Sequence, residues 1–103
     1  MLQTFRAQDR LTVLLEGELD HYCASGVHLQ LDRLLADPTI RCLEFDMRAL
    51  TFMDSSGIGV ILGRYRILRD RGGTVEVSHM NPHIARIFRM SGMDRLIRDL
   101  DRA

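Results

Sequence analysis

The sequence predicts one α/β domain, built on a mostly parallel sheet of four or five strands with one antiparallel edge strand and helices packed on it. Three observations support this fold class. The chain has 103 residues, which is the size of one ordinary domain. It opens with two consecutive strand-like stretches, and helical and strand-like patterns alternate from there onward. Strands joined through a helix run parallel, so only the first pair is expected to be antiparallel.

The first predicted element is a hairpin. Residues 3–5 and 11–16 are short apolar-rich stretches, and the polar residues 8–10 between them favour a tight turn. A helix is expected next, with Asp20 as its capping residue and Pro38 just beyond its end. Its apolar stripe consists of Ala24, Val27, Leu31, Leu34 and Leu35.

A strand and a longer helix are predicted in the middle of the chain. Residues 41–46 mix β-favouring and charged residues, which places Leu43 and Phe45 on one face of a third strand. The next helix has one apolar face and a more solvent-exposed side rich in arginine, and it is expected to end at Gly72-Gly73. Its apolar positions are Ile58, Ile61, Leu62, Tyr65 and Leu68, and its arginines are Arg64, Arg66, Arg69 and Arg71.

The last part of the chain predicts a fourth strand and a third helix. Residues 74–78 favour a strand, and Asn81-Pro82 is a typical helix start because proline suits the first helical position. The buried positions of this helix are Ile84, Ile87 and Phe88. The tail, residues 93–103, fits either an edge strand at residues 96–97 or a short helix.

Composition excludes several classes of function. The 14 basic residues, all arginine, balance 14 acidic residues, so the positive surface typical of duplex-binding proteins is not expected. No apolar run approaches the roughly 18 residues of a membrane-spanning helix, and the start lacks the apolar stretch of a signal peptide. We therefore expect a cytoplasmic protein without a direct nucleic-acid or membrane partner.

The cysteines and histidines do not suggest metal or redox chemistry. Cys23 and Cys42 form no C-x-x-C pair, and the four histidines form no helical ligand motif. Two buried thiols are the expected arrangement, because a free cysteine behaves as a small apolar residue. No metal and no cofactor are predicted.

The most informative segment is residues 51–63, T-F-M-D-S-S-G-I-G-V-I-L-G, between the end of a strand and the start of a helix. Such junctions are where α/β sheets build their sites, and the first turn of a helix favours an anion or a capping hydroxyl. Ser55 and Ser56 lie at this point. Gly57 and Gly59 remove side chains on either side of Ile58, although glycine in a helix costs about 0.5–1 kcal/mol relative to alanine. We therefore expect another molecule or segment to approach this backbone closely.

Several interpretations of this segment compete. The simplest is that Asp54, Ser55 or Ser56 only caps the helix. Gly57, Gly59 and Gly63 could form a dinucleotide-binding loop, with Glu76 as the ribose-binding acid, but too few residues follow for two nucleotide-binding halves. A serine hydrolase lacks support because no G-x-S-x-G motif is present. The remaining hypothesis is a serine that accepts phosphate from another protein's active site.

The segment also resembles a known family. Residues 52–66, F-M-D-S-S-G-I-G-V-I-L-G-R-Y-R, are similar to the signature of STAS-domain anti-sigma factor antagonists of spore-forming bacteria. Three further stretches agree in order: G-E-L-D-H at 17–21, I-R-x-x-x-x-D at 40–46 and M-S-G-M at 90–93. The resemblance implies a single STAS domain over residues 1–103, and its fold agrees with the predicted order of elements.

The resemblance implies a switch protein with no catalysis of its own. In the family, the unphosphorylated protein binds an anti-sigma factor, which is also a serine kinase, and releases a sporulation-type sigma factor. Phosphorylation at the position of Ser55 ends binding, and a PP2C-type phosphatase reverses it. Ser56 is expected to cap the helix. The residues expected to contact the partner are Asp20, Asp54, Ser56, Gly57, Ile58 and Gly59. A STAS module of another partner-switching pathway, in stress or sensory signalling, is the alternative.

Overall fold

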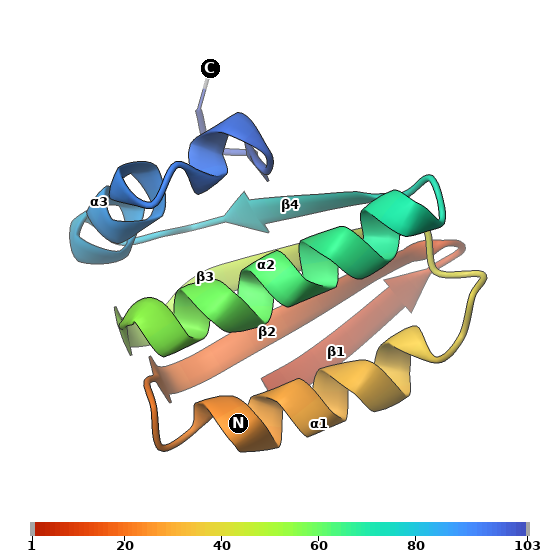
Figure 1. Cartoon of the computed structure of the whole chain (residues 1–103), viewed down its shortest axis with the longest axis horizontal. Coiled ribbons are helices and arrows are strands. Elements are labelled where there is room, and N and C mark those ends of the chain that lie inside the picture. Colours follow the sequence, from red (N-terminus) through yellow and green to blue (C-terminus); the bar gives the residue numbers. More distant parts are fainter. Residues whose placement is uncertain (1, 103) are drawn as a thin grey trace.

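The computed structural model describes residues 2–102, and it contains three α-helices and a five-stranded sheet. The elements along the chain are β1 (Leu2–Ala7), β2 (Arg10–Leu19), α1 (Ala24–Leu35), β3 (Cys42–Met53), α2 (Ser55–Asp70), β4 (Thr74–Ser78), α3 (Pro82–Met90), a short 3₁₀ helix (Met93–Arg95) and β5 (Arg98–Asp99) (Figure 1). The predicted order of elements is confirmed.

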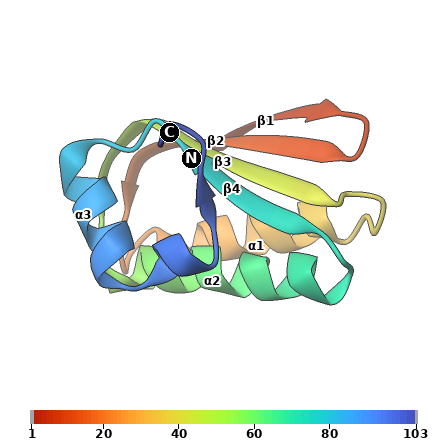
Figure 2. The same cartoon turned by 90° about the horizontal axis from the view of Figure 1, so that it is seen from above.

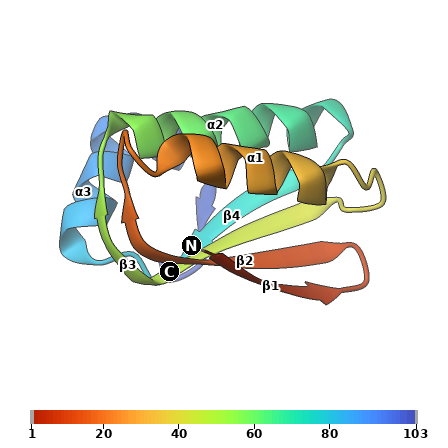
Figure 3. The ribbon, with the colours of Figure 1, turned by 90° about the horizontal axis from the view of Figure 1, so that it is seen from below.

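The sheet has the predicted mixed topology. Its strands lie in the order β1-β2-β3-β4-β5, with β1 antiparallel to β2 and every other neighbouring pair parallel. Helices α1 and α2 lie side by side on one face, and α3 lies beside the end of β3 (Figures 2 and 3). None of the helices in the described part of the chain is long and apolar enough to cross a membrane.

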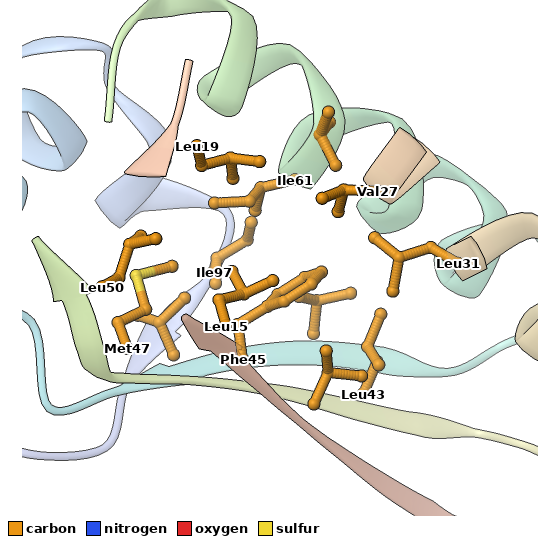
Figure 4. Packing of buried hydrophobic residues seen from close by; sticks show 14 of the residues in the cluster. Leu15, Leu19, Val27, Leu31, Leu43, Phe45, Met47, Leu50, Ile61 and Ile97 are labelled. Atoms are coloured by element: carbon orange, nitrogen blue, oxygen red, sulfur yellow. The ribbon is translucent and has the colours of Figure 1, made fainter. Parts of the chain in front are cut away.

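The core lies between the sheet and α1 and α2. Alternate residues of the strands face the helices, as the period-two pattern requires. Phe45, on the central strand, is completely buried, and side chains from the neighbouring strands and helices gather around it (Figure 4). The fully buried large side chains include Leu15, Leu19, Leu31, Leu43, Met47, Met53, Ile61, Leu68, Ile84 and Ile97.

The face of the sheet opposite α1 and α2 is held by a charged cluster. The Arg10 guanidinium donates to Glu44 Oε1 at 2.6 Å and to Glu76 Oε1 at 2.7 Å, so one side chain links β2, β3 and β4. The hydrogen bond to Glu44 contributes most to the raised pKa of Arg10, although burial opposes it. This cluster holds the three strands together on the side that the helices leave uncovered.

The buried face of α2 differs from the predicted one. Arg64, expected on the wet side, is buried with 3% of its surface exposed, and its guanidinium lies 3.3 Å from the Asp32 carboxylate of α1. Leu62 and Tyr65, expected to be buried, are only half-buried. The reason is the packing of α1 against α2, which covers a second side of the helix that its own periodicity does not reveal.

Two other expectations about single residues are corrected. Cys23 is exposed at the position just before α1, and Cys42 is half-buried because it faces the uncovered side of the sheet beside Arg10. In the tail the strand alternative holds rather than the helix, although β5 is formed at Arg98–Asp99, two residues later than expected. The strand starts later because a 3₁₀ helix, Met93–Arg95, comes first. It follows Gly92, whose φ is +81°.

Candidate functional site

The candidate site lies where β2 and β3 end side by side. The register pairs Leu19 with Met53, and the Asp54 amide donates to Leu19 O at 3.4 Å. Asp20 follows one strand and Asp54 the other, so the parallel sheet brings the G-E-L-D and D-S-S-G stretches together. This juxtaposition gives the start of α2 a neighbour from the loop before α1.

Asp54 caps α2 and also ties it to the neighbouring loop. One carboxylate oxygen, Oδ1, accepts from the Ser56 amide at 2.8 Å, and Oδ2 accepts from the His21 amide at 3.2 Å. The expectation that Ser56 caps the helix is therefore wrong. Ser56 follows the first helical residue and supplies the amide that is capped, because the strand leads directly into the helix at Asp54.

Asp20 organises the loop that precedes α1. Its carboxylate accepts from the amides of Tyr22 and Cys23, each at 3.0 Å. The Cys23 amide is the main reason why the pKa of Asp20 lies below its ordinary value, so the side chain stays ionised. Asp20 is not the capping residue predicted from the sequence, because a turn intervenes and Cys23 occupies that position without a side-chain cap.

Ser55 is the first residue of α2 and is exposed to solvent. Because Asp54 provides the cap, the start of α2 does not depend on the Ser55 hydroxyl. The first turn of a helix carries partial positive charge, which favours a negatively charged group at this position. The arrangement therefore presents a hydroxyl at a point that can tolerate a phosphate.

The two glycines flanking Ile58 have different surroundings. A Cβ atom built on Gly57 would lie 2.5 Å from Met53 Cγ and 2.7 Å from the Leu19 carbonyl oxygen. Gly57 is buried, and it allows α2 to pack directly on the ends of β2 and β3. The close approach predicted at Gly57 is therefore made from within the molecule, rather than by a visiting molecule.

Gly59, by contrast, has no such internal requirement. An added Cβ at Gly59 would meet nothing within 4 Å, and the same holds for Gly63 one turn later. Gly59 is exposed, whereas the Ile58 side chain is half-buried against the core. Of the residues expected to contact a partner, Gly59 is thus the one on α2 whose small size the fold does not explain.

The structure contradicts the dinucleotide-loop interpretation. Gly57, Gly59 and Gly63 all lie inside α2, so they do not form a loop that could wrap a pyrophosphate. Glu76, the proposed ribose-binding acid, is bound by Arg10 on the side of the sheet away from α2. The glycine backbone that this interpretation needs is part of a helix, and the acid that it needs is paired with Arg10.

Two exposed aromatic side chains that the sequence did not single out lie close in the chain to Asp54 and Asp20. Phe52, at the end of β3, is 40% exposed and stacks on His83 of α3 with ring centroids 5.6 Å apart. Tyr22, in the loop before α1, is 89% exposed. Phe52 alternates with the buried Met53, so its outward direction could have been read from the strand period once the strand's length was known.

Comparisons with known proteins agree with this geometry. The family model described as "STAS domain" matches residues 3–103. The chain is 39% identical over 87 residues to an anti-sigma F factor antagonist of Paenibacillus polymyxa, covering 84% of this chain and 74% of that relative. It is 28% identical over 92 residues to an anti-sigma-B factor antagonist of Listeria monocytogenes, covering 89% and 80% respectively.

A solved structure gives the same result for the fold. The anti-sigma factor antagonist SpoIIAA in its unphosphorylated form is similar to this chain with a TM-score of 0.84 and 26% sequence identity. That match covers 96% of this chain and 87% of SpoIIAA. The family model, the sequence relatives and the solved structure therefore agree on the family. The chain belongs to the STAS-domain family, among the anti-sigma factor antagonists.

Proposed function

We propose that this protein is a phosphorylation-controlled switch that binds an anti-sigma factor and thereby releases a sporulation-type sigma factor. The unphosphorylated protein is the binding form, and phosphate on Ser55 ends the interaction. The observation that supports this most directly is the exposed Ser55 at the first position of α2, with capping left to Asp54. The fold therefore does not require this hydroxyl for capping α2.

The proposed switch acts through charge rather than through a change of fold. Phosphate adds about −1.5 to −2 charge at pH 7, and a helix start accommodates it. Asp20 and Asp54 already place negative charge at the same edge of the sheet. A partner that docks here must desolvate the phosphate beside these carboxylates, and like-charge contacts in an interface cost several kcal/mol.

The proposed partners follow from the same switch. A serine kinase, the anti-sigma factor itself, phosphorylates Ser55, and a PP2C-type phosphatase removes the phosphate. The proposed contact surface consists of Asp20, Asp54, Ser56, Gly57, Ile58 and Gly59, with the buried Gly57 contributing only through its effect on backbone packing. The protein itself performs no catalysis, and we propose that it works in the cytoplasm as one STAS domain without direct contact to nucleic acid or membrane.

A second candidate is the corresponding switch in a stress pathway. The chain is 28% identical to an anti-sigma-B factor antagonist but 39% identical to an anti-sigma F factor antagonist. The higher identity favours the F type. The two candidates share the chemistry at Ser55 and differ in the partner.

Phosphorylation can be tested with the anti-sigma F factor of Paenibacillus polymyxa and ATP, followed by intact-mass measurement. We expect the wild-type chain and Ser56→Ala to gain one phosphate each, and Ser55→Ala to gain none. Ser56 is the matched control because it is the adjacent hydroxyl in the same helical turn. A phosphate that persists in Ser55→Ala and disappears in Ser56→Ala would contradict the assignment. Absence of both phosphorylation and binding for the wild-type chain, with this kinase and with an anti-sigma-B factor, would contradict the proposed function.

A further inference from the structure

A groove runs between α1 and α2 from the position next to Ser55. It is a shallow, open depression with a volume of about 420 Å³. The two helices lie side by side (Figure 1). The residues along it that matter here are Ala24, Ser25 and Leu29 on α1 and Ser56, Gly59 and Val60 on α2. Most of these side chains are small, and Leu29 is 55% exposed although it is apolar. The groove is thus a mainly apolar depression that adjoins the candidate site.

The one ionisable side chain on the wall of the groove already has partners within the molecule. His28 Nε2 lies 3.1 Å from the Asp32 carboxylate, and its Nδ1 lies 3.2 Å from the Arg64 guanidinium. These contacts fix the ring between α1 and α2. Both ring nitrogens of His28 are therefore engaged, and the groove suits an apolar group better than a polar one.

Gly59 lines the groove and adds no side chain to it. Unlike Gly57, it faces open space, so no contact within the protein excludes a side chain there. Glycine inside a helix is unfavourable relative to alanine, and no packing contact within the described residues accounts for it at Gly59. A methyl group at this position would extend into the groove that Gly59 lines.

We propose that this groove receives an apolar side chain of the anti-sigma factor, with Gly59 as its floor and Leu29 as its rim. The inference rests on the proposed function. The segment that carries the side chain also presents basic residues toward Ser55, because the carboxylates of Asp20 and Asp54 form no ion pair within the described residues. The interface therefore extends from the start of α2 onto α1, beyond the residues of the D-S-S-G segment.

The test compares Gly59→Ala with Gly63→Ala, since both glycines lie in α2 and both face open space. Each substitution is expected to raise the melting temperature, because alanine favours the helix. Binding to the anti-sigma F factor of Paenibacillus polymyxa, measured by calorimetry with ADP present, should weaken about tenfold or more for Gly59→Ala, as overfilling a packed site does. Gly63→Ala should bind like the wild-type chain.

A second pair of variants tests the α1 side. Leu29→Asp should weaken binding by a similar factor, whereas Gln30→Asp, at the next exposed position, which does not line this groove, should not. Unchanged binding by both Gly59→Ala and Leu29→Asp would overturn the groove proposal. The proposal would also be overturned if Gly63→Ala and Gln30→Asp lost as much binding affinity as Gly59→Ala and Leu29→Asp. If the wild-type chain still binds and Ser55 is still phosphorylated, either result leaves the proposed function standing.

Discussion

Adjacent residues at the start of α2 divide three tasks between them. Asp54 caps the helix, Ser55 displays a hydroxyl to solvent, and Ser56 supplies the amide that Asp54 accepts. Because the Asp54 carboxylate is the cap, the Ser55 hydroxyl is not needed to cap the helix.

The effect of phosphate on binding is expected to be large. Phosphorylated protein should bind the anti-sigma F factor of Paenibacillus polymyxa at least about a hundredfold more weakly than Ser55→Ala, since each 1.4 kcal/mol of repulsion corresponds to tenfold. Calorimetry with ADP present measures both affinities. Circular dichroism of the two proteins serves as the control and should show the same helix content. Equal affinities would refute a switch based on charge.

At the scale of the element, α2 is positioned by its contacts with the ends of β2 and β3. The backbone at Gly57 approaches the Leu19 carbonyl and the Met53 side chain so closely that no side chain fits between them. On the other side, Arg64 reaches the Asp32 carboxylate of α1. The strand ends and α1 together fix the direction of the helix that carries Ser55.

Gly57→Ala should therefore destabilise the protein by about 1–3 kcal/mol, the usual cost of forcing an extra carbon into a packed region. Gly63→Ala is the matched control in the same helix and should raise stability by about 0.5–1 kcal/mol, because nothing opposes its methyl group. Urea denaturation followed by circular dichroism measures both changes. A stabilising effect at Gly57 would show that α2 does not pack on the strand ends as described.

At the scale of the whole molecule, carboxylates tie together segments that are distant in the chain. Asp37 accepts from the Thr39 hydroxyl at 2.6 Å and from Arg6 of β1 at 2.6 Å, and both interactions hold its pKa well below its usual range. Asp46 lies 3.2 Å from Nδ1 of His79, which follows β4. Burial opposes a lowered pKa at Asp46, but hydrogen bonds from the nearby Arg48 outweigh it. These links depend on the carboxylates being ionised.

Acid should therefore weaken the fold. A carboxylate whose pKa is lower in the folded state stabilises that state above its unfolded pKa of about 3.9, and this contribution is lost as the pH falls toward the folded value. The free energy of unfolding should decrease from about pH 5 to about pH 2. Asp37→Asn should show a shallower decrease over the same range, measured by urea denaturation at each pH. If the free energy of unfolding depends on pH in the same way for the wild-type chain and Asp37→Asn, Asp37 does not contribute to the loss of stability in acid.

The order of elements, the mixed sheet and the position of the D-S-S-G segment at a strand–helix junction were all determined by the sequence. These features depend on local periodicity, on capping and turn residues, and on the rule that helix-connected strands run parallel. The tertiary structure alone decided that the Asp54 carboxylate also accepts from the His21 amide, that Gly57 serves packing while Gly59 does not, and that Arg64 is buried. Each of these depends on which atoms of β2, β3 and α1 come to lie beside α2, and strand register and helix packing set those contacts between segments far apart in the chain.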